Sequence, residues 1–230
     1  MKKITWMVQA LIVLALLLTG CVGQGAGVNQ PVTLRVGWLG FPDTLNPAYA
    51  FLSEAYSMFD LIYSTLAVES PTGEYVPGLA TEWSVSDDGL TWTFKLRQGV
   101  KWHNGEPLTA EQIAWNLNAF INNPDGWVTN SSYVIGFVEA RVVDASTLVI
   151  ETEYPISNMD YRVSYLYIVY PPDFEGYTTP EDLQNFSNFS PIGSGAFKIA
   201  RLDKDQRVIV LETNRDFYEG AAKIDEIIYQ

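Results

Sequence analysis

The chain has 230 residues, of which 47% are hydrophobic and 18% are charged, a composition that is typical of globular proteins and excludes an intrinsically disordered chain. Its formal net charge of −13 at pH 7 repels the phosphate backbone of nucleic acids, so we expect no nucleic-acid partner. The 13 Tyr, 11 Phe and 7 Trp residues suit a surface that binds organic ligands, although many of them belong in a core.

The first 20 residues have the pattern of a secretory signal peptide. Lys2 and Lys3 precede an apolar run over residues 4–18, which is shorter than a spanning helix of about 20 apolar residues. The run meets the sequence Leu-Thr-Gly-Cys, and Cys21 is the only cysteine of the chain. This ending resembles the bacterial lipoprotein signal, which implies lipid attachment at Cys21 and a flexible tether over residues 21–31. The alternative is an uncleaved membrane anchor with an unmodified cysteine.

Two elements are predicted directly after the tether. Residues 32–38 alternate in polarity and are rich in β-branched side chains, which predicts a strand. A loop follows through Pro42 and Pro47. Over residues 48–66 the apolar side chains recur at helical spacing, so we expect a helix whose buried face includes Phe51.

The next elements have local signals at their turns and caps. Asp88-Gly89 is a strong hairpin dipeptide and joins predicted strands over 83–86 and 90–96. Thr109 and Gln112 have capping-box spacing and begin a helix. The remaining expected elements are a hairpin over 138–143 and 147–152, a short helix over 157–163, a strand over 165–170, a helical turn at 181–183, a hairpin over 196–202 and 207–213, and a strand over 223–229. The fold class is therefore α+β, a mixed α/β chain.

The residues that could carry catalysis or bind a metal have structural interpretations. His103 is the only histidine and lies in a Trp-His-Asn-Gly turn, so we expect a structural hydrogen bond there. Asp87-Asp88 lies in a hairpin turn, where side-chain bonds to the backbone explain it better than paired catalytic carboxylates. The sequence thus predicts no catalytic, cofactor or metal site.

One short glycine-rich segment is a candidate ligand contact. Gly193, Ser194 and Gly195 lack the lysine of a phosphate loop and the spacing of a dinucleotide fingerprint. Two interpretations remain open, a close-packed turn or a cleft wall whose backbone donors meet a ligand.

The loop after the first strand is the second candidate contact. Phe41, Asp43, Asn46 and Tyr49 lie on it, and ligands bind preferentially at strand ends because loops there are free of ladder hydrogen bonds. We expect Phe41 and Asp43 to be exposed.

Two segments carry motifs of a known family. Residues 77–120 read PGLATEWSVSDDGLTWTFKLRQGVKWHNGEPLTAEQIAWNLNAF, and residues 191–229 contain PIGSGAFKI, NRDFYEG and KIDEIIY in that order. With GFPDTLNP and IYSTLAVESPTGEYVPGLA before them, these resemble the extracellular solute-binding proteins of family 5, the oligopeptide, dipeptide and nickel class that serves ATP-driven ABC importers.

The resemblance implies a class II periplasmic-binding-protein-like fold of two lobes with the ligand between them. The sheet domain of the first lobe would comprise residues 32–54 and 186–230, with a subdomain over 55–185 inserted between them. The second lobe would follow Gln230, where the sequence stops within an apparent strand, so we expect an N-terminal fragment. One lobe offers one wall of a cleft and should bind poorly alone.

The function implied by the resemblance is that of a substrate-binding lipoprotein of an ABC importer, without enzyme activity. It would capture a peptide or similar solute in the cell envelope, lipid-anchored at the outer face of the cytoplasmic membrane or in the periplasm, and deliver it to permease subunits. Peptide, nickel complex, sugar and opine remain open as ligands. The alternatives are a cell-surface lipoprotein enzyme or a ligand sensor on the same scaffold.

The lipidation site has a direct test. We expect Cys21→Ser to leave the protein unlipidated, because the thiol is the group that would receive lipid. Detergent phase partitioning checks this, with the wild type in the detergent phase and the variant in the aqueous phase. Equal partitioning of the two proteins would contradict the prediction.

Overall fold

The computed structural model describes residues 31–177, 179–184 and 191–230. The expected signal segment over 1–20, the lipidation site Cys21 and the tether up to residue 30 lie outside these ranges. Within the described ranges, no helix combines the length and the hydrophobicity needed to cross a bilayer.

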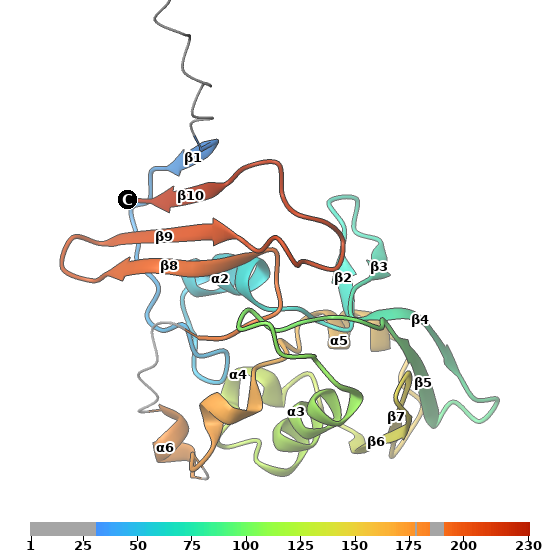
Figure 1. The fold of residues 1–230 in the computed structure, drawn as a ribbon. Helices are drawn as coiled ribbons and strands as arrows, with labels where there is room; N and C mark the ends of the chain where they lie inside the picture. The colour runs from blue at the N-terminus through green and yellow to red at the C-terminus, as the bar shows by residue number, and fades with distance from the viewer. Residues whose placement is uncertain (1–30, 178, 185–190) are drawn as a thin grey trace, which may run out of the picture. The chain divides into compact units, whose positions relative to one another are not determined.

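A four-stranded sheet pairs the first and last strands of the described chain (Figure 1). Its strand order is β1-β10-β9-β8, in which β1 is parallel to β10 and the other neighbours are antiparallel. Beyond the parallel pair, the Trp38 N–H donates to the Gln230 carbonyl at 2.9 Å. The four strands are β1 (Thr33–Val36), β8 (Phe197–Asp203), β9 (Val208–Thr213) and β10 (Glu226–Tyr229).

The helix α2 (Ser53–Ile62) lies against β8 and contributes to the core (Figure 1). It is shorter than the predicted range 48–66, and the prediction that Phe51 is buried is wrong, because that side chain is 70% exposed. Phe51 lies in extended chain before the helix, where its N–H donates to the Asp43 carboxylate at 2.9 Å. The buried residues of α2 repeat at helical spacing: Ala55, Met58, Phe59 and Ile62.

A second, antiparallel sheet has the order β4-β5-β7-β6, and one long helix packs against β6 and β7. Both hairpins of this sheet confirm the sequence prediction, as does the mixture of helices with mainly antiparallel strands. The elements of this part are β4 (Ala80–Val85), β5 (Thr91–Leu96), α3 (Ala110–Asn122), β6 (Phe137–Asp144) and β7 (Thr147–Thr152). The smaller elements are β2 (Ala67–Glu69), β3 (Tyr75–Pro77), α4 (Val128–Ser131), α5 (Met159–Ser164), a 3₁₀ helix η1 (Pro171–Phe174) and α6 (Pro180–Gln184).

The start of α3 confirms the capping box predicted from the sequence. The Thr109 hydroxyl accepts from the Gln112 N–H at 3.3 Å, and the Gln112 side chain accepts from the Thr109 N–H at 3.1 Å. Two N–H groups that a helix start leaves without partners are thereby satisfied. The same Gln112 oxygen accepts from the indole of the buried Trp102 at 2.9 Å, which ties the helix start to the preceding turn.

Residues 165–170 differ from the sequence prediction, because they form a single bridge, Ser64 to Ile168, and no strand of a sheet. The side chain of Asn116 on α3 takes the place of a neighbouring strand. Its amide donates to the Val169 carbonyl at 2.9 Å and its oxygen accepts from the Val169 N–H at 2.9 Å. Asn116 and Val169 are both fully buried, so water cannot serve as the hydrogen-bond partner of the Val169 N–H and carbonyl. The Asn116 side chain takes that part and fixes the extended segment.

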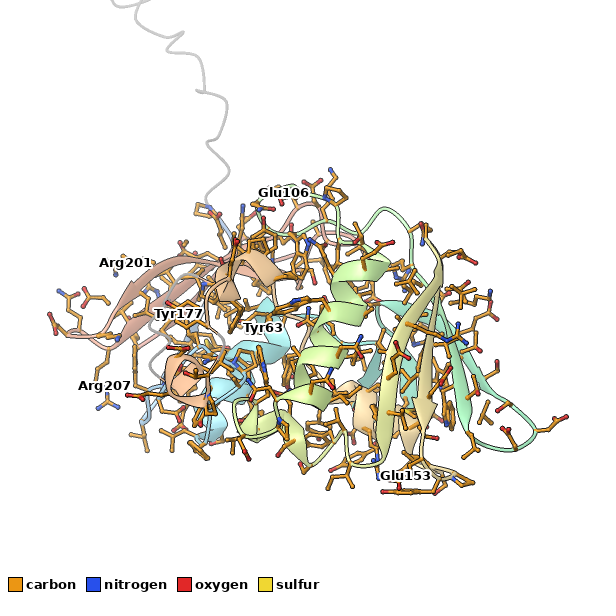
Figure 2. The ribbon with its side chains drawn as sticks, turned by 90° about the horizontal axis from the view of Figure 1, so that it is seen from below. Tyr63, Glu106, Glu153, Tyr177, Arg201 and Arg207 are labelled. Carbon is orange, nitrogen blue, oxygen red and sulfur yellow. The ribbon has the colours of Figure 1, made fainter. Side chains whose placement is uncertain are left out.

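A buried tyrosine connects the loop after β1 to the end of α2. Figure 2 shows Tyr63 beside α2 in the interior, whereas Glu153, Arg201 and Arg207 lie at the periphery. The Tyr63 hydroxyl donates to the Leu45 carbonyl at 2.9 Å. Leu45 lies in the loop between β1 and α2, so this hydrogen bond holds the loop against the end of α2.

Residues 193–195 pass so close to the end of α2 that only glycine fits at two positions. The Gly195 N–H donates to the Ile62 carbonyl at 2.8 Å. A Cβ on Gly193 would lie 1.9 Å from the same carbonyl oxygen, and a Cβ on Gly195 would lie 2.5 Å from the Leu61 carbonyl oxygen. Side chains at these positions would force the backbones apart. We call residues 193–195, with the Ile62 carbonyl, the glycine clamp.

His103 closes the glycine clamp from the other side. The backbone N–H of His103 donates to the Gly193 carbonyl at 2.8 Å, and its ring Nδ1 accepts from the Gly193 N–H at 3.2 Å. Its Nε2 lies 3.1 Å from the Gly195 carbonyl oxygen, which can only accept. This arrangement requires a neutral ring with its proton on Nε2, and it confirms the structural role predicted for His103.

Asn116 provides a stability test. We expect Asn116→Ala to lower the free energy of unfolding by about 1–3 kcal/mol, because the buried backbone groups of Val169 lose their partners. The exposed Asn122 on the same helix is the matched control, and Asn122→Ala should change stability by about 0.5 kcal/mol or less. Urea unfolding followed by circular dichroism measures both, and equal effects would contradict the pairing.

His103 provides a pH test. Burial, opposed by the Gly195 hydrogen bond, lowers the pKa of His103 from 6.5 to about 4. Between these values the unfolded chain binds more protons, so this contribution to stability is full above pH 6.5 and is lost as the pH falls towards 4. In a tag-free protein, the proton resonances of the single imidazole should titrate near pH 4 when folded and near 6.5 in urea. Titration near 6.5 in the folded protein would exclude this role.

Candidate functional site

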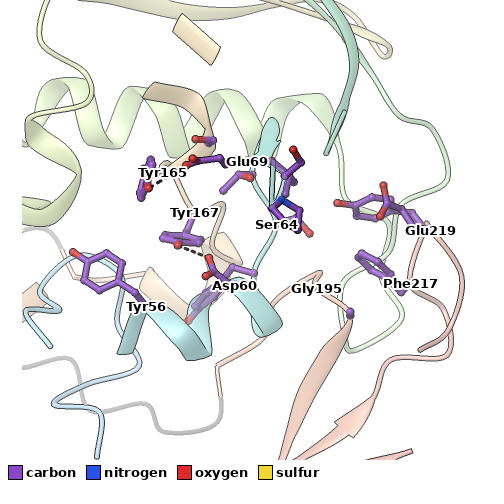
Figure 3. A pocket seen from close by; sticks show the side chains of 17 residues that line it. Tyr56, Asp60, Ser64, Glu69, Tyr165, Tyr167, Gly195, Phe217 and Glu219 are labelled. Carbon is purple, nitrogen blue, oxygen red and sulfur yellow. Dashed lines mark hydrogen bonds between the residues drawn. The ribbon is translucent and has the colours of Figure 1, made fainter. Parts of the chain in front are cut away.

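A cavity of about 650 Å³ opens where α2, the β2–β3 hairpin and the start of β8 meet (Figure 3). Five separate segments line it, and most of its large side chains are tyrosines. We call it the tyrosine pocket. Its lining residues are Tyr56, Asp60, Tyr63, Ser64, Thr65, Val68, Glu69, Ser70, Pro71, Ser164, Tyr165, Tyr167, Gly195, Ala196, Phe217, Tyr218 and Glu219.

The aromatic side chains of the tyrosine pocket are packed against one another. Tyr167 is buried, and its ring centroid lies 5.4 Å from that of Phe59 and 6.4 Å from that of Tyr63. Tyr165 stacks on Tyr133, with centroids 5.2 Å apart and planes 3° from parallel. Such contacts restrict ring motion, so the aromatic wall is already formed without a ligand.

Two hydrogen-bonded pairs place acidic groups in the tyrosine pocket. The Tyr167 hydroxyl donates to Asp60 at 2.7 Å, and the Tyr165 hydroxyl donates to Glu69 at 3.4 Å, as the dashed lines in Figure 3 show. Desolvation raises the pKa of Asp60 against the opposing effect of the Tyr167 bond. Desolvation and then the neighbouring carboxylate raise the pKa of each tyrosine, so both remain neutral donors.

The third carboxylate, Glu219, lies on the loop between β9 and β10. Its oxygen is 3.8 Å from the Arg97 guanidinium, and both side chains are partly exposed. The same guanidinium lies 4.8 Å from the Tyr218 ring centroid and donates to the Gly78 carbonyl at 3.1 Å. Arg97 therefore anchors this loop at the edge of the tyrosine pocket and partly neutralises Glu219.

Only one of the three residues of the glycine segment proposed from the sequence lines the tyrosine pocket. Gly195 lines the tyrosine pocket, whereas Gly193 and Ser194 are not among its lining residues. All three are buried, and the close approach to Ile62 has the character of a packed turn. The segment therefore positions one wall of the cavity and contributes one residue to its surface.

The loop residues proposed from the sequence lie outside the tyrosine pocket. Asp43 is exposed as expected, but the expectation that Phe41 is exposed is wrong, because its ring is half-buried against the core. Asn46 is buried and donates to the Leu183 carbonyl at 2.8 Å, and the Tyr49 hydroxyl donates to the Asp125 carbonyl at 3.2 Å. The loop meets the pocket through Tyr56, whose hydroxyl donates to the Ala50 carbonyl at 3.3 Å.

Asp60, Tyr165 and Tyr167 are pocket residues that sequence reasoning missed. The last two lie in a segment that read as an ordinary strand, and Asp60 lies in an amphipathic helix where polar positions are expected. One weak signal was available, since Tyr165 and Tyr167 alternate and place two hydroxyls on one side of an extended chain. Their meeting with Asp60 and Glu69 depends on long-range packing.

The described residues contain no group of three or more His, Cys, Asp or Glu side chains that could hold a metal ion. Two acidic groups and two phenolic groups of the tyrosine pocket are hydrogen-bonded to one another. The lining of the pocket includes no His, Cys or Lys.

Three comparisons identify what the chain is similar to. It is 27% identical to the oligopeptide-binding protein AppA of Bacillus subtilis over 100% of this chain and 44% of that protein. It is 24% identical to the nickel-binding periplasmic protein of Escherichia coli over 92% of this chain and 40% of that protein. The structure of AppA with a nonapeptide matches 87% of this chain and 40% of its own length, with a TM-score of 0.75 and 23% identity.

These matches confirm the mixed α/β fold as part of the class II solute-binding protein structures. The chain spans about two fifths of the length of the relatives it matches, 44% and 40% for the two proteins above. Residues 74–230 match the family described as "Bacterial extracellular solute-binding proteins, family 5 Middle". The family binds solutes and is not one of enzymes, as the sequence predicted. The chain belongs to the bacterial extracellular solute-binding proteins of family 5.

Proposed function

We propose that the protein is the substrate-binding component of an ABC importer, which captures a peptide or a similar solute outside the cytoplasmic membrane and delivers it to the permease. Membership of family 5 over residues 74–230 is the observation that carries this proposal. The printed names of two relatives, an oligopeptide-binding and a nickel-binding protein, make peptides and nickel complexes the first ligands to test.

In this proposal the described residues are the first of two lobes. Support comes from the sheet that pairs β1 with β10, because its strands come from the two ends of the described chain and the second sheet lies between them in sequence. Residues 32–54 and 186–230 would form the sheet domain, and residues 55–185 the inserted subdomain. A second lobe, expected from the sequence after Gln230, would provide the opposite wall and close on the ligand by a hinge motion.

The tyrosine pocket is the part of this lobe that we assign to the solute. Its volume of about 650 Å³ is within the range of small-molecule sites, and its rigid aromatic wall with a few polar groups has their usual chemistry. Gly195 belongs to this wall. We keep Phe41, Asp43 and Tyr49 as the proposed rim, because their loop adjoins the pocket at Tyr56, and the buried Asn46 would hold that loop in place. Gly193 and Ser194 would fix the wall from behind.

We further propose that lipid at Cys21 anchors the protein at the outer face of the cytoplasmic membrane or in the periplasm. The signal-like segment before Cys21 and the family's extracellular character support this location. Stable anchoring needs more than one acyl chain, which a lipoprotein of this type would carry.

Titration calorimetry on the full-length gene product tests the proposal. We expect saturable binding of at least one member of a panel that contains di- to nonapeptides and nickel–histidine complexes, because the tyrosine pocket presents both apolar and hydrogen-bonding surface. Phe217→Ala removes an aromatic wall residue and should weaken binding by about tenfold. Glu82→Gln, an exposed change on β4 outside the pocket, is the control. Failure of the whole panel to bind would contradict the proposed function.

A further inference from the structure

The loop between β9 and β10 forms one side of the tyrosine pocket through Phe217, Tyr218 and Glu219 (Figure 3). The two ends of this loop lie close together, because the Thr213 N–H donates to the Asp225 carbonyl at 3.0 Å. Compact surface loops with close ends take their shape from side-chain packing rather than from a sheet. The position of this side of the cavity therefore depends on what holds the tip of the loop.

One side chain outside the lining, Arg97, holds the loop tip by two contacts. Its Nη2 lies 3.8 Å from a Glu219 oxygen, and its guanidinium carbon lies 4.8 Å from the Tyr218 ring centroid. The ion pair alone would be weak, because both charged side chains are partly exposed to solvent. The second contact places the cation over the half-buried ring of Tyr218, where the attraction is less screened by water.

The same guanidinium reaches a second part of the lining through Gly78. Its Nε donates to the Gly78 carbonyl at 3.1 Å, and the Arg97 N–H donates to the Leu79 carbonyl at 2.8 Å. Gly78 lies so close to the lining residue Thr65 that a Cβ there would be 2.5 Å from the Thr65 carbonyl oxygen. The Leu79 N–H donates to that oxygen at 2.9 Å. Arg97 is thereby fixed to the wall that contains Thr65.

The shape of the guanidinium, more than its charge, allows these contacts to coexist. The group is planar and presents donors in several fixed directions, so that it can donate to Gly78 while it faces Tyr218 and Glu219. A lysine ammonium carries the same charge as a single point on a flexible stem. It could neutralise Glu219, but it could not bridge the two walls.

We propose that Arg97 is a positioning residue for solute binding, which sets the width of the tyrosine pocket by joining the wall at Thr65 to the loop that carries Phe217 and Tyr218. This inference rests on the proposed solute-binding function and adds to it a residue that does not contact the solute. Without the bridge the loop tip opens independently of the other wall, and a bound solute leaves faster.

Hydrogen exchange followed by mass spectrometry on the full-length gene product, without solute, tests the bridge itself. In Arg97→Lys we expect amide exchange over residues 214–224 to be about tenfold faster than in the wild type, the effect of losing one charge-assisted hydrogen bond, and exchange over α3 to be unchanged. The matched control is Arg141→Lys, because Arg141 pairs with Glu151 at 3.0 Å on the second sheet, outside the pocket. Unchanged exchange over 214–224 in Arg97→Lys would overturn the inference.

Stopped-flow binding of the tightest peptide or nickel–histidine complex of the panel tests the effect on the solute. Arg97→Lys should raise the dissociation rate constant about tenfold and change the association rate constant by less than about twofold, whereas Arg141→Lys should change neither. A variant that was only partly folded would show a smaller binding amplitude with both rate constants unchanged, so this split separates positioning from a general loss of structure.

The outcomes distinguish this inference from the function on which it rests. Wild-type binding together with an unchanged dissociation rate constant in Arg97→Lys would overturn the positioning role alone. Absence of wild-type binding by every peptide and nickel complex would overturn the proposed function, and the positioning role with it.

Discussion

The contact on which the rest of the structure depends is the approach of residues 193–195 to the carbonyl end of α2. Only glycines allow it, because a Cβ on Gly193 would lie 1.9 Å from the Ile62 oxygen. His103 closes the contact through both ring nitrogens, and Asn214 donates to the Gly195 carbonyl at 2.9 Å. Three segments that are far apart in sequence meet here, so the start of β8 is fixed against α2. That placement forms one wall of the tyrosine pocket.

The opposite wall depends on polar contacts that replace regular sheet pairing. Asn116 holds Val169, and with it the extended segment that carries Tyr165 and Tyr167. The Tyr167 hydroxyl then meets Asp60 on α2, whose carboxyl is desolvated enough to raise its pKa. A carboxylate held partly out of water opposes folding, since its charged form is disfavoured there.

Much of the fold could be predicted from the sequence because its signals are local. The capping box at Thr109, the Asp88-Gly89 turn and the three hairpins depend on residues within a few positions of one another. Residues 165–170 have the composition of a strand, but their partner is a side chain on α3, which no local pattern indicates. The tyrosine pocket was missed for the same reason, since its five segments meet only in the folded chain. Gly195 was found through its glycine pattern, and its part in packing was one of the two interpretations left open.

The most direct test of the central claim, that the cavity at the junction between α2 and β8 receives part of the solute, is a crystal structure of the full-length gene product with a bound peptide. We predict that part of the peptide lies in the tyrosine pocket, in contact with Phe217 or Tyr218. A peptide bound elsewhere, with no part of it in this cavity, would contradict the claim.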